Sequence, residues 1–171
     1  MTNSNHFFLL VKISIIAFIT GAISLPSFLE LASPFWLLPF FSYWVIYSNG
    51  KNIFASAFIL GILLDIIEGG TLGQNAVALV LSSAFILNVK KSFFVSNLTT
   101  QQVYIFLGSI IYLIIFLLVQ QLTQGLNFEW LILLSPFTSA ILWPLIRYLS
   151  LIHISEPTRL LSISYAVFCL K

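Results

Sequence analysis

Apolar residues in this chain fall into six runs, separated by short groups of polar residues, glycines or prolines. The runs cover residues 7–25, 35–47, 53–67, 72–89, 103–122 and 130–149. A helix needs about 20 apolar residues to cross the hydrocarbon core of a bilayer, and most of the runs approach that length. The pattern predicts an all-α integral membrane protein, a bundle of about six transmembrane helices.

The second and third runs are short for a full span. Their length predicts tilted helices, a locally thin arrangement or a partly re-entrant second helix. The lysines Lys90 and Lys91 are expected to end the fourth helix. Residues 92–102 are expected to form the longest polar connection, either a solvated loop or a weakly amphipathic surface that meets a partner.

Composition agrees with a chain that lies mostly in lipid. Hydrophobic residues make up 60% of the sequence and charged residues 7%, and the mean hydropathy is +1.07. A soluble domain carries roughly a quarter charged residues. The net charge of +2 is too small to indicate a nucleic-acid partner. Membrane lipids are therefore the expected surroundings.

Charged residues divide between the two sides of the predicted bundle. When six spans alternate, the basic residues fall on the side of the N-terminus and the acidic loop residues on the other side. The two groups are Lys12, Lys51, Lys90, Lys91 and Arg147, and Glu30, Glu68 and Glu129. Cytoplasmic loops carry the excess of lysine and arginine in membrane proteins. We therefore expect both ends of the bundle in the cytoplasm.

Residues 150–171 depart from this pattern, so residues 1–149 are taken as the transmembrane domain. The tail opens with a polar stretch, and its apolar end, residues 160–170, is too short to span a bilayer. One interpretation is a cytoplasmic tail with an interfacial segment. The other, which we adopt as the expectation, is a non-native or disordered end, because the string SLIHISEPTR resembles translated adapter or vector sequence.

Sequence signatures of catalysis are missing. The two histidines, His6 and His153, lie near the ends of the chain and cannot form a His-Glu-x-x-His zinc site. No Gly-x-Ser-x-Gly nucleophile elbow occurs. The glycines of residues 69–73 resemble a phosphate-binding loop, but no lysine follows them. We expect no enzymatic activity, no cofactor and no metal site.

Asp65 is an acidic residue inside the third apolar run. An ionisable side chain within a span costs about 2.5–3.5 kcal/mol on insertion scales and is a functional candidate by default. Asp65 lies three residues before Glu68, which places it about 5 Å below the membrane interface at 1.5 Å per residue. Two roles are open: a functional carboxylate, or an interfacial one that reaches water or caps a neighbouring helix.

A stripe of small residues leads to this carboxylate. Ala57, Gly61 and Asp65 recur every four residues, so they share one helix face and allow another helix to approach closely. The glycine pair that begins at Gly69 is expected to end the third helix. These features predict a tightly packed helical hairpin.

The fourth helix is expected to begin with a capping box. Thr71 is followed three residues later by Gln74, with Gly73 between them, and this spacing lets each side chain bind the other residue's backbone N–H. The box places Asn75 about as deep in the membrane as Asp65. A hydrogen bond between Asp65 and Asn75 is therefore predicted.

The sixth run contains Trp143, Pro144 and Arg147 close together. A proline within a helix removes a backbone hydrogen bond and can kink the span. Trp143 and Arg147 suit the inner membrane interface, so an aromatic and basic anchor is the expected role.

Several of these segments resemble the bacterial rod shape-determining protein MreD family. The matching pieces are Pro34-Phe35-Trp36-Leu37, Tyr43-Trp44, residues 58–65, residues 69–76 and Leu142-Trp143-Pro144. The resemblance covers residues 13–149, and its most specific part is the hairpin that holds Gly61 and Asp65. It implies a fold similar to the six-helix substrate-binding subunits of energy-coupling-factor transporters.

The resemblance also implies a function in cell shape. It predicts a non-enzymatic, multi-pass protein of the bacterial inner membrane that acts as a scaffold with a bitopic MreC-type partner and other elongation-complex proteins to direct peptidoglycan synthesis. The alternative is a small-molecule or lipid-intermediate binding or transport subunit, with a pocket near Asp65 and Asn75. The candidate packing and partner-binding residues are Gly61, Asp65, Gly69, Gly73, Asn75, Trp143 and Pro144.

Overall fold

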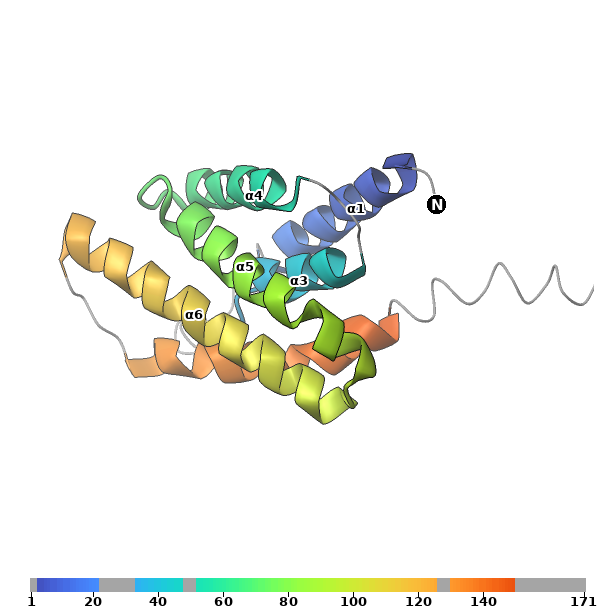
Figure 1. Cartoon of the computed structure of the whole chain (residues 1–171). Coiled ribbons are helices and arrows are strands. Elements are labelled where there is room, and N and C mark those ends of the chain that lie inside the picture. The colour runs from blue at the N-terminus through green and yellow to red at the C-terminus, as the bar shows by residue number, and fades with distance from the viewer. Residues whose placement is uncertain (1–2, 22–32, 48–51, 126–129, 150–171) are drawn as a thin grey trace, which may run out of the picture.

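The chain folds into a bundle of helices joined by short turns (Figure 1). The computed structural model describes residues 3–21, 33–47, 52–125 and 130–149. The helices are α1 (Asn3–Gly21), α3 (Leu37–Tyr47), α4 (Ile53–Glu68), α5 (Gln74–Val95) and α6 (Leu98–Gln124). The 3-10 helix η1 (Trp130–Leu134) leads into a last α-helix over residues 135–149. The prediction of an all-α membrane protein is confirmed.

Each predicted apolar run overlaps one of these helices, but the helices differ in length. Among the described residues, three stretches are long and apolar enough to cross a membrane, namely Gln74–Val95, Leu98–Thr123 and Trp130–Leu149. The stretches Leu10–Gly21 and Leu37–Tyr47 are apolar but shorter. The tail beginning at residue 150, whose origin was questioned from the sequence, lies outside the described residues.

Successive helices run in alternating directions between the two ends of the bundle (Figure 1). One end holds the α4–α5 turn and the end of α6, and the other holds the α5–α6 turn and residue 149. Helix α5 packs against α4 on one side and α6 on the other, while α3 packs against α1, α5 and α6. Helix α5 therefore packs against α3, α4 and α6.

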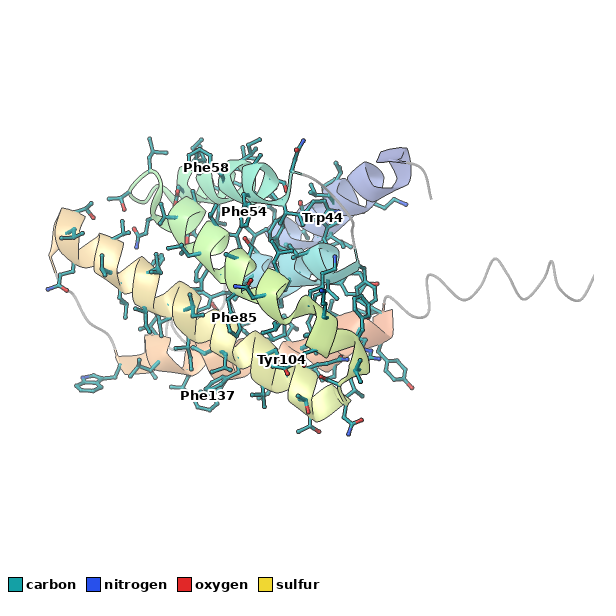
Figure 2. The ribbon with its side chains drawn as sticks, in the orientation of Figure 1. Trp44, Phe54, Phe58, Phe85, Tyr104 and Phe137 are labelled. Atoms are coloured by element: carbon teal, nitrogen blue, oxygen red, sulfur yellow. The ribbon has the colours of Figure 1, made fainter. Side chains whose placement is uncertain are left out.

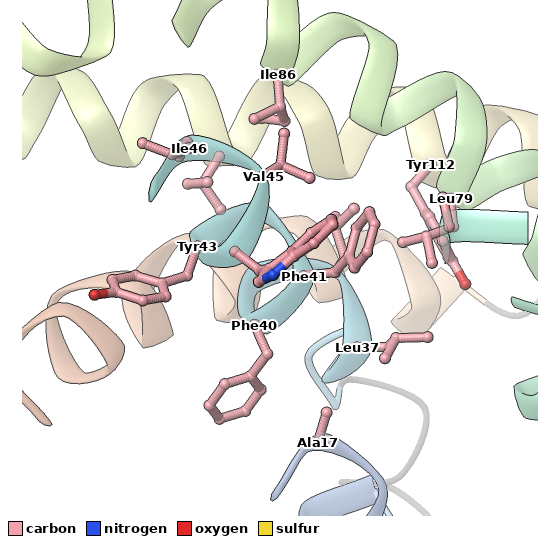
Figure 3. Packing of buried hydrophobic residues seen from close by; sticks show 14 of the residues in the cluster. Ala17, Leu37, Phe40, Phe41, Tyr43, Val45, Ile46, Leu79, Ile86 and Tyr112 are labelled. Carbon is pink, nitrogen blue, oxygen red and sulfur yellow. The ribbon is translucent and has the colours of Figure 1, made fainter. Parts of the chain in front are cut away.

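The short helix α3 forms the centre of the hydrophobic core. Its 11 residues span only about 16 Å at 1.5 Å per residue. Every residue from Leu37 to Ile46 is buried. Figure 3 shows Phe40 directed toward α1 and Val45 directed toward Ile86 of α5. A helix that is apolar on all sides is one that other helices cover, which accounts for the apolar composition of the second run.

The outer surface of the bundle is apolar. Large side chains such as Phe54 and Phe58 on α4 and Phe137 on the last helix are about half exposed (Figure 2). In a soluble protein, surfaces of this kind mark contact sites. In a membrane protein they face the lipid chains, so the exterior agrees with the membrane assignment.

The predicted connection over residues 92–102 is wrong. Helix α5 continues past Lys91 to Val95, and α6 begins at Leu98. The two lysines do not end the helix because long basic side chains can extend to polar surroundings while their stems remain at the apolar surface. At the N-terminus of the chain, α1 begins at Asn3, so the exposed Lys12 lies within that helix.

Candidate functional site at the turn between α4 and α5

The small-residue stripe of α4 faces α5, as the sequence predicts. Ala57, Gly61 and Asp65 are all buried on one face of α4. A Cβ atom added to Gly61 would lie 2.2 Å from the Cα atom of Ala76 and 2.6 Å from its backbone nitrogen. No side chain fits in that space, so α4 and α5 are in backbone contact at this point.

Helix α4 ends at the predicted glycine. Gly69 has a φ of 68°, in the left-handed region, and its backbone N–H donates to the carbonyl oxygen of Asp65. The N–H of Gly70 donates to the same carbonyl at 3.2 Å. Glycine adopts this conformation without the steric cost of a Cβ atom, and the bonds satisfy a carbonyl group at the helix end.

The carboxylate of Asp65 caps the start of α5. Its side chain is 1% exposed. Oδ2 accepts a hydrogen bond from the backbone N–H of Gly73 at 2.7 Å, and Oδ1 accepts one from the N–H of Asn75 at 2.9 Å. The first N–H groups of a helix have no partner within the helix and carry a partial positive charge, so an anion there is stabilised and stabilising. Of the two roles left open for Asp65, the geometry is that of a cap for a neighbouring helix.

The capping box predicted for Thr71 and Gln74 does not form. Gly73, with a φ of 96°, occupies the N-cap position of α5, and no side chain of the turn itself caps the helix. The two predicted side chains instead bond each other, Thr71 Oγ1 donating to Gln74 Oε1 at 2.6 Å. The box is unnecessary because Asp65 accepts two other N–H groups at the start of α5, and the N–H of Gln74 donates to the carbonyl oxygen of Thr71 at 3.2 Å.

The side chain of Asn75 joins three helices. The predicted contact with Asp65 exists, but through the backbone N–H of Asn75. The Asn75 side chain donates from Nδ2 to Glu68 at 2.9 Å, and its Oδ1 accepts a hydrogen bond from the hydroxyl group of Tyr112 on α6. Gln74 adds a bond from Nε2 to the carbonyl oxygen of Phe116, also on α6, at 3.2 Å. We call Asp65, Glu68, Asn75 and Tyr112 the α4–α5 polar cluster.

Glu68 and Tyr112 were not among the candidates. Glu68 was assigned only to a side of the membrane, and Tyr112 lies in an apolar run with no polar neighbour to mark it. Tyr112 is buried, and a buried hydroxyl group normally has a partner. The spacing along α6 alone does not reveal which helix supplies that partner.

Trp143 and Pro144 lie apart from the α4–α5 polar cluster. Trp143 is 0% exposed and packs edge-to-face on Phe93 of α5, with ring centroids 5.3 Å apart. Its Nε1 donates to Gln101 Oε1 at 3.4 Å, and Arg147 Nη1 donates to the same oxygen. The expected role of Trp143 as an interface anchor is wrong, because its indole ring is part of the core. Pro144, its neighbour, is half-buried.

Gln101 organises this second group of contacts. Its Nε2 donates to the carbonyl oxygens of Phe93 and Ser96, both at 3.1 Å. Gln101, Trp143 and Arg147 are called the α5–α6 polar cluster below. Gln101 precedes Tyr112 by 11 residues on α6, or about 16 Å along the helix axis. The seven candidates therefore divide into Gly61, Asp65, Gly69, Gly73 and Asn75 at one turn, and Trp143 and Pro144 at the other.

The polar groups of the interior bond to one another. Among the described residues, no buried side-chain nitrogen or oxygen lacks a hydrogen-bond partner. Within that same part of the chain, no three His, Cys, Asp or Glu residues are grouped closely enough to hold a metal ion. Fold and site together define a polytopic α-helical membrane protein whose buried polar residues fix the helices to one another.

Comparison with known proteins gives the family. The family model described as rod shape-determining protein MreD matches residues 1–152. A rod shape-determining protein MreD of Haemophilus influenzae (strain ATCC 51907 / DSM 11121 / KW20 / Rd) is 30% identical over 141 residues, which cover 81% of this chain and 86% of that protein. The chain belongs to the MreD family of rod shape-determining proteins. No solved structure matches it.

Proposed function

We propose that this protein is a non-enzymatic scaffold of the cell-elongation machinery in the bacterial inner membrane. Its partners would be a bitopic MreC-type protein and other elongation-complex proteins that direct peptidoglycan synthesis. Membership of the MreD family carries the shape-determining part of the proposal. The scaffold part is supported by the interior, because the buried side chains of Asp65, Asn75 and Gln101 form hydrogen bonds between helices.

The orientation of the bundle is part of the proposal. Lys90, Lys91 and Arg147 lie toward the end that holds the α5–α6 turn, and Asp65 and Glu68 lie at the other end. Basic residues favour the cytoplasmic side. This distribution supports cytoplasmic termini and an α4–α5 turn on the opposite side of the inner membrane.

Gly61 and Asp65 would act on partners indirectly. Gly61 is covered by Ala76, and Asp65 is buried, so neither residue can contact a partner helix. We propose that they set the position of the α4–α5 hairpin, whose outer face carries Phe54, Phe58 and Leu63. A partner helix that packs on this face would then depend on Asp65 without contacting it.

Complementation and co-purification test the proposal together. A strain that lacks its own MreD and has lost rod shape is supplied with the full chain, with a version that ends at Leu149, or with Asp65→Ala. We expect the truncated version to restore rods and to retain the bitopic partner, and Asp65→Ala to lose both. Loss of function in the truncated version would reject the proposed domain limit, and full partner retention by Asp65→Ala would reject the proposed role of the hairpin.

The alternative, a subunit that binds a small molecule or lipid intermediate, has one observation in its favour. A cavity of about 490 Å³ lies beside the α4–α5 polar cluster, and Asn75 helps to line it.

A further inference from the structure

The cavity lies between α1, the segment that leads into α3, and the adjoining parts of α4, α5 and α6. Its volume of about 490 Å³ falls in the range of about 300–1,000 Å³ that is usual for small-molecule sites. Most of its wall is apolar, with Phe18, Trp36, Leu64 and Phe116 among the lining residues. Such a wall suits the hydrocarbon or glycerol-ester part of a lipid.

The polar part of the wall is negatively charged. Glu68 is the one charged residue among the described residues that line the cavity, beside Asn75 and Tyr112. Its side chain is exposed, and Asn75 Nδ2 is the donor that it binds within the cluster. A carboxylate can accept about four hydrogen bonds. It therefore retains capacity for a donor from a ligand.

The Glu68 charge has no basic counterpart among the described residues that line the cavity. The described lining holds no lysine, arginine or histidine. A ligand with a positive charge would complement this part of the protein.

The size of the cavity favours a lipid headgroup over a protein helix. A helix with its side chains is about 10 Å wide, so a volume of about 490 Å³ would hold roughly one turn. A headgroup and the first part of its chains fit that volume. We propose that the cavity binds a phospholipid with a primary ammonium group, the ammonium on the Glu68 carboxylate and the apolar part against the aromatic wall. Trp36 adds an aromatic face of the kind that attracts cations.

Native mass spectrometry of the purified full chain tests this assignment. The protein is reconstituted in bilayers with equal amounts of phosphatidylethanolamine and phosphatidylglycerol, matched in their acyl chains, and then transferred to detergent. We expect one retained phosphatidylethanolamine and a preference over phosphatidylglycerol of about tenfold, the effect of roughly one charge-assisted hydrogen bond.

Three variants separate the parts of the site. Glu68→Gln keeps an oxygen for the Asn75 bond but removes the charge, and it should reduce the headgroup preference to near one. Leu64→Trp fills the cavity and should abolish retention of either lipid. Ile114→Trp is the control, because Ile114 on α6 is exposed and lies outside the described lining. It should behave as the unchanged protein. Thermal unfolding of each variant in the same detergent shows which of them are folded.

Several results would overturn the proposal. Equal retention of the two lipids, an unchanged preference in folded Glu68→Gln, or undiminished retention in folded Leu64→Trp would each do so. A segment of a co-purified protein found in the cavity by cross-linking from position 64 would also reject a lipid as the occupant. These readouts do not depend on complementation, so they are independent of the scaffold proposal.

Discussion

The two ends of α5 are held by opposite chemistry. At its start, backbone N–H groups bind the carboxylate of Asp65 from α4. Near its end, the backbone carbonyls of Phe93 and Ser96 bind the amide of Gln101 from α6. A helix exposes donors at its first turn and acceptors at its last. The protein supplies an acceptor with a negative charge at one end and a neutral donor at the other.

Charge makes the first end the stronger of the two. Hydrogen bonds to an ionised group contribute roughly twice as much as neutral ones. The Asp65 carboxylate also lies against the positive end of the α5 dipole. We therefore expect substitutions in the α4–α5 polar cluster to destabilise the fold more than comparable substitutions in the α5–α6 polar cluster.

Removal of the Asp65 carboxylate should have the largest effect. Asp65→Ala leaves two buried N–H groups without acceptors, and at about 1.5–3 kcal/mol per charge-assisted bond the loss is about 4 kcal/mol. Asp65→Asn keeps an acceptor oxygen and should lose about half of that. Denaturant unfolding in detergent micelles measures both. A loss below about 1 kcal/mol for Asp65→Ala would show that these bonds do not hold the hairpin.

Disruption of the helix contact at Gly61 should cause the second largest loss of stability. In Gly61→Ala the new Cβ atom meets the backbone of Ala76, which cannot turn aside, so we expect a loss of about 3 kcal/mol. Gly108→Ala is the matched control on α6, since its Cβ atom would lie 3.1 Å from the flexible Cδ1 of Ile86. That variant should change the stability by less than about 1 kcal/mol. Similar losses at both positions would contradict a special contact at Gly61.

A substitution at the C-terminal end of α5 should reduce the stability of the fold by a smaller amount. Gln101→Ala removes the neutral donors for Phe93 and Ser96 and the acceptor that Trp143 and Arg147 share, and we expect a loss of about 2 kcal/mol. The same unfolding experiment applies. A loss greater than that of Asp65→Ala would reverse the proposed ranking of the two ends.

The smallest effect concerns Tyr112. Tyr112→Phe removes one hydrogen bond to Asn75 and should cost about 1 kcal/mol. In an Asn75→Ala background the same substitution should cost nothing further. Asp65→Ala and Asn75→Ala should instead be nearly additive, because Asp65 binds the backbone of Asn75 and not its side chain. Strong coupling between the latter pair would contradict the observed geometry.

Local patterns predicted much of the first end and little of the second. The four-residue spacing of Ala57, Gly61 and Asp65 fixes a helix face, and glycine at position 69 ends a helix for a reason that depends on its own backbone. Both signals lie within one segment, so the sequence is sufficient to recognise them. The capping box was also predicted from local spacing. That prediction was wrong because the acceptor that caps α5, Asp65, comes from a different helix.

The second end depends on contacts between distant segments. Trp143 is a residue type common at membrane interfaces, yet it packs on Phe93 and donates a hydrogen bond to Gln101, 42 residues earlier. Gln101 was assigned to a solvated connection, and the same position is buried in the structure. The hydrophobic pattern predicts the number of helices and the fold class. It does not show which helix faces pack together, and the contacts of Trp143 and Gln101 depend on that packing.

Backbone hydrogen exchange tests the central claim most directly, namely that the Asp65 carboxylate fixes the start of α5. Exchange is measured by mass spectrometry on peptides that cover residues 72–77 and 96–101, in the unchanged protein and in Asp65→Asn. We predict exchange at least about tenfold faster in 72–77 and unchanged exchange in 96–101, because only the first peptide holds the N–H groups of Gly73 and Asn75. Unchanged exchange in 72–77, or equal acceleration in both peptides, would contradict the account.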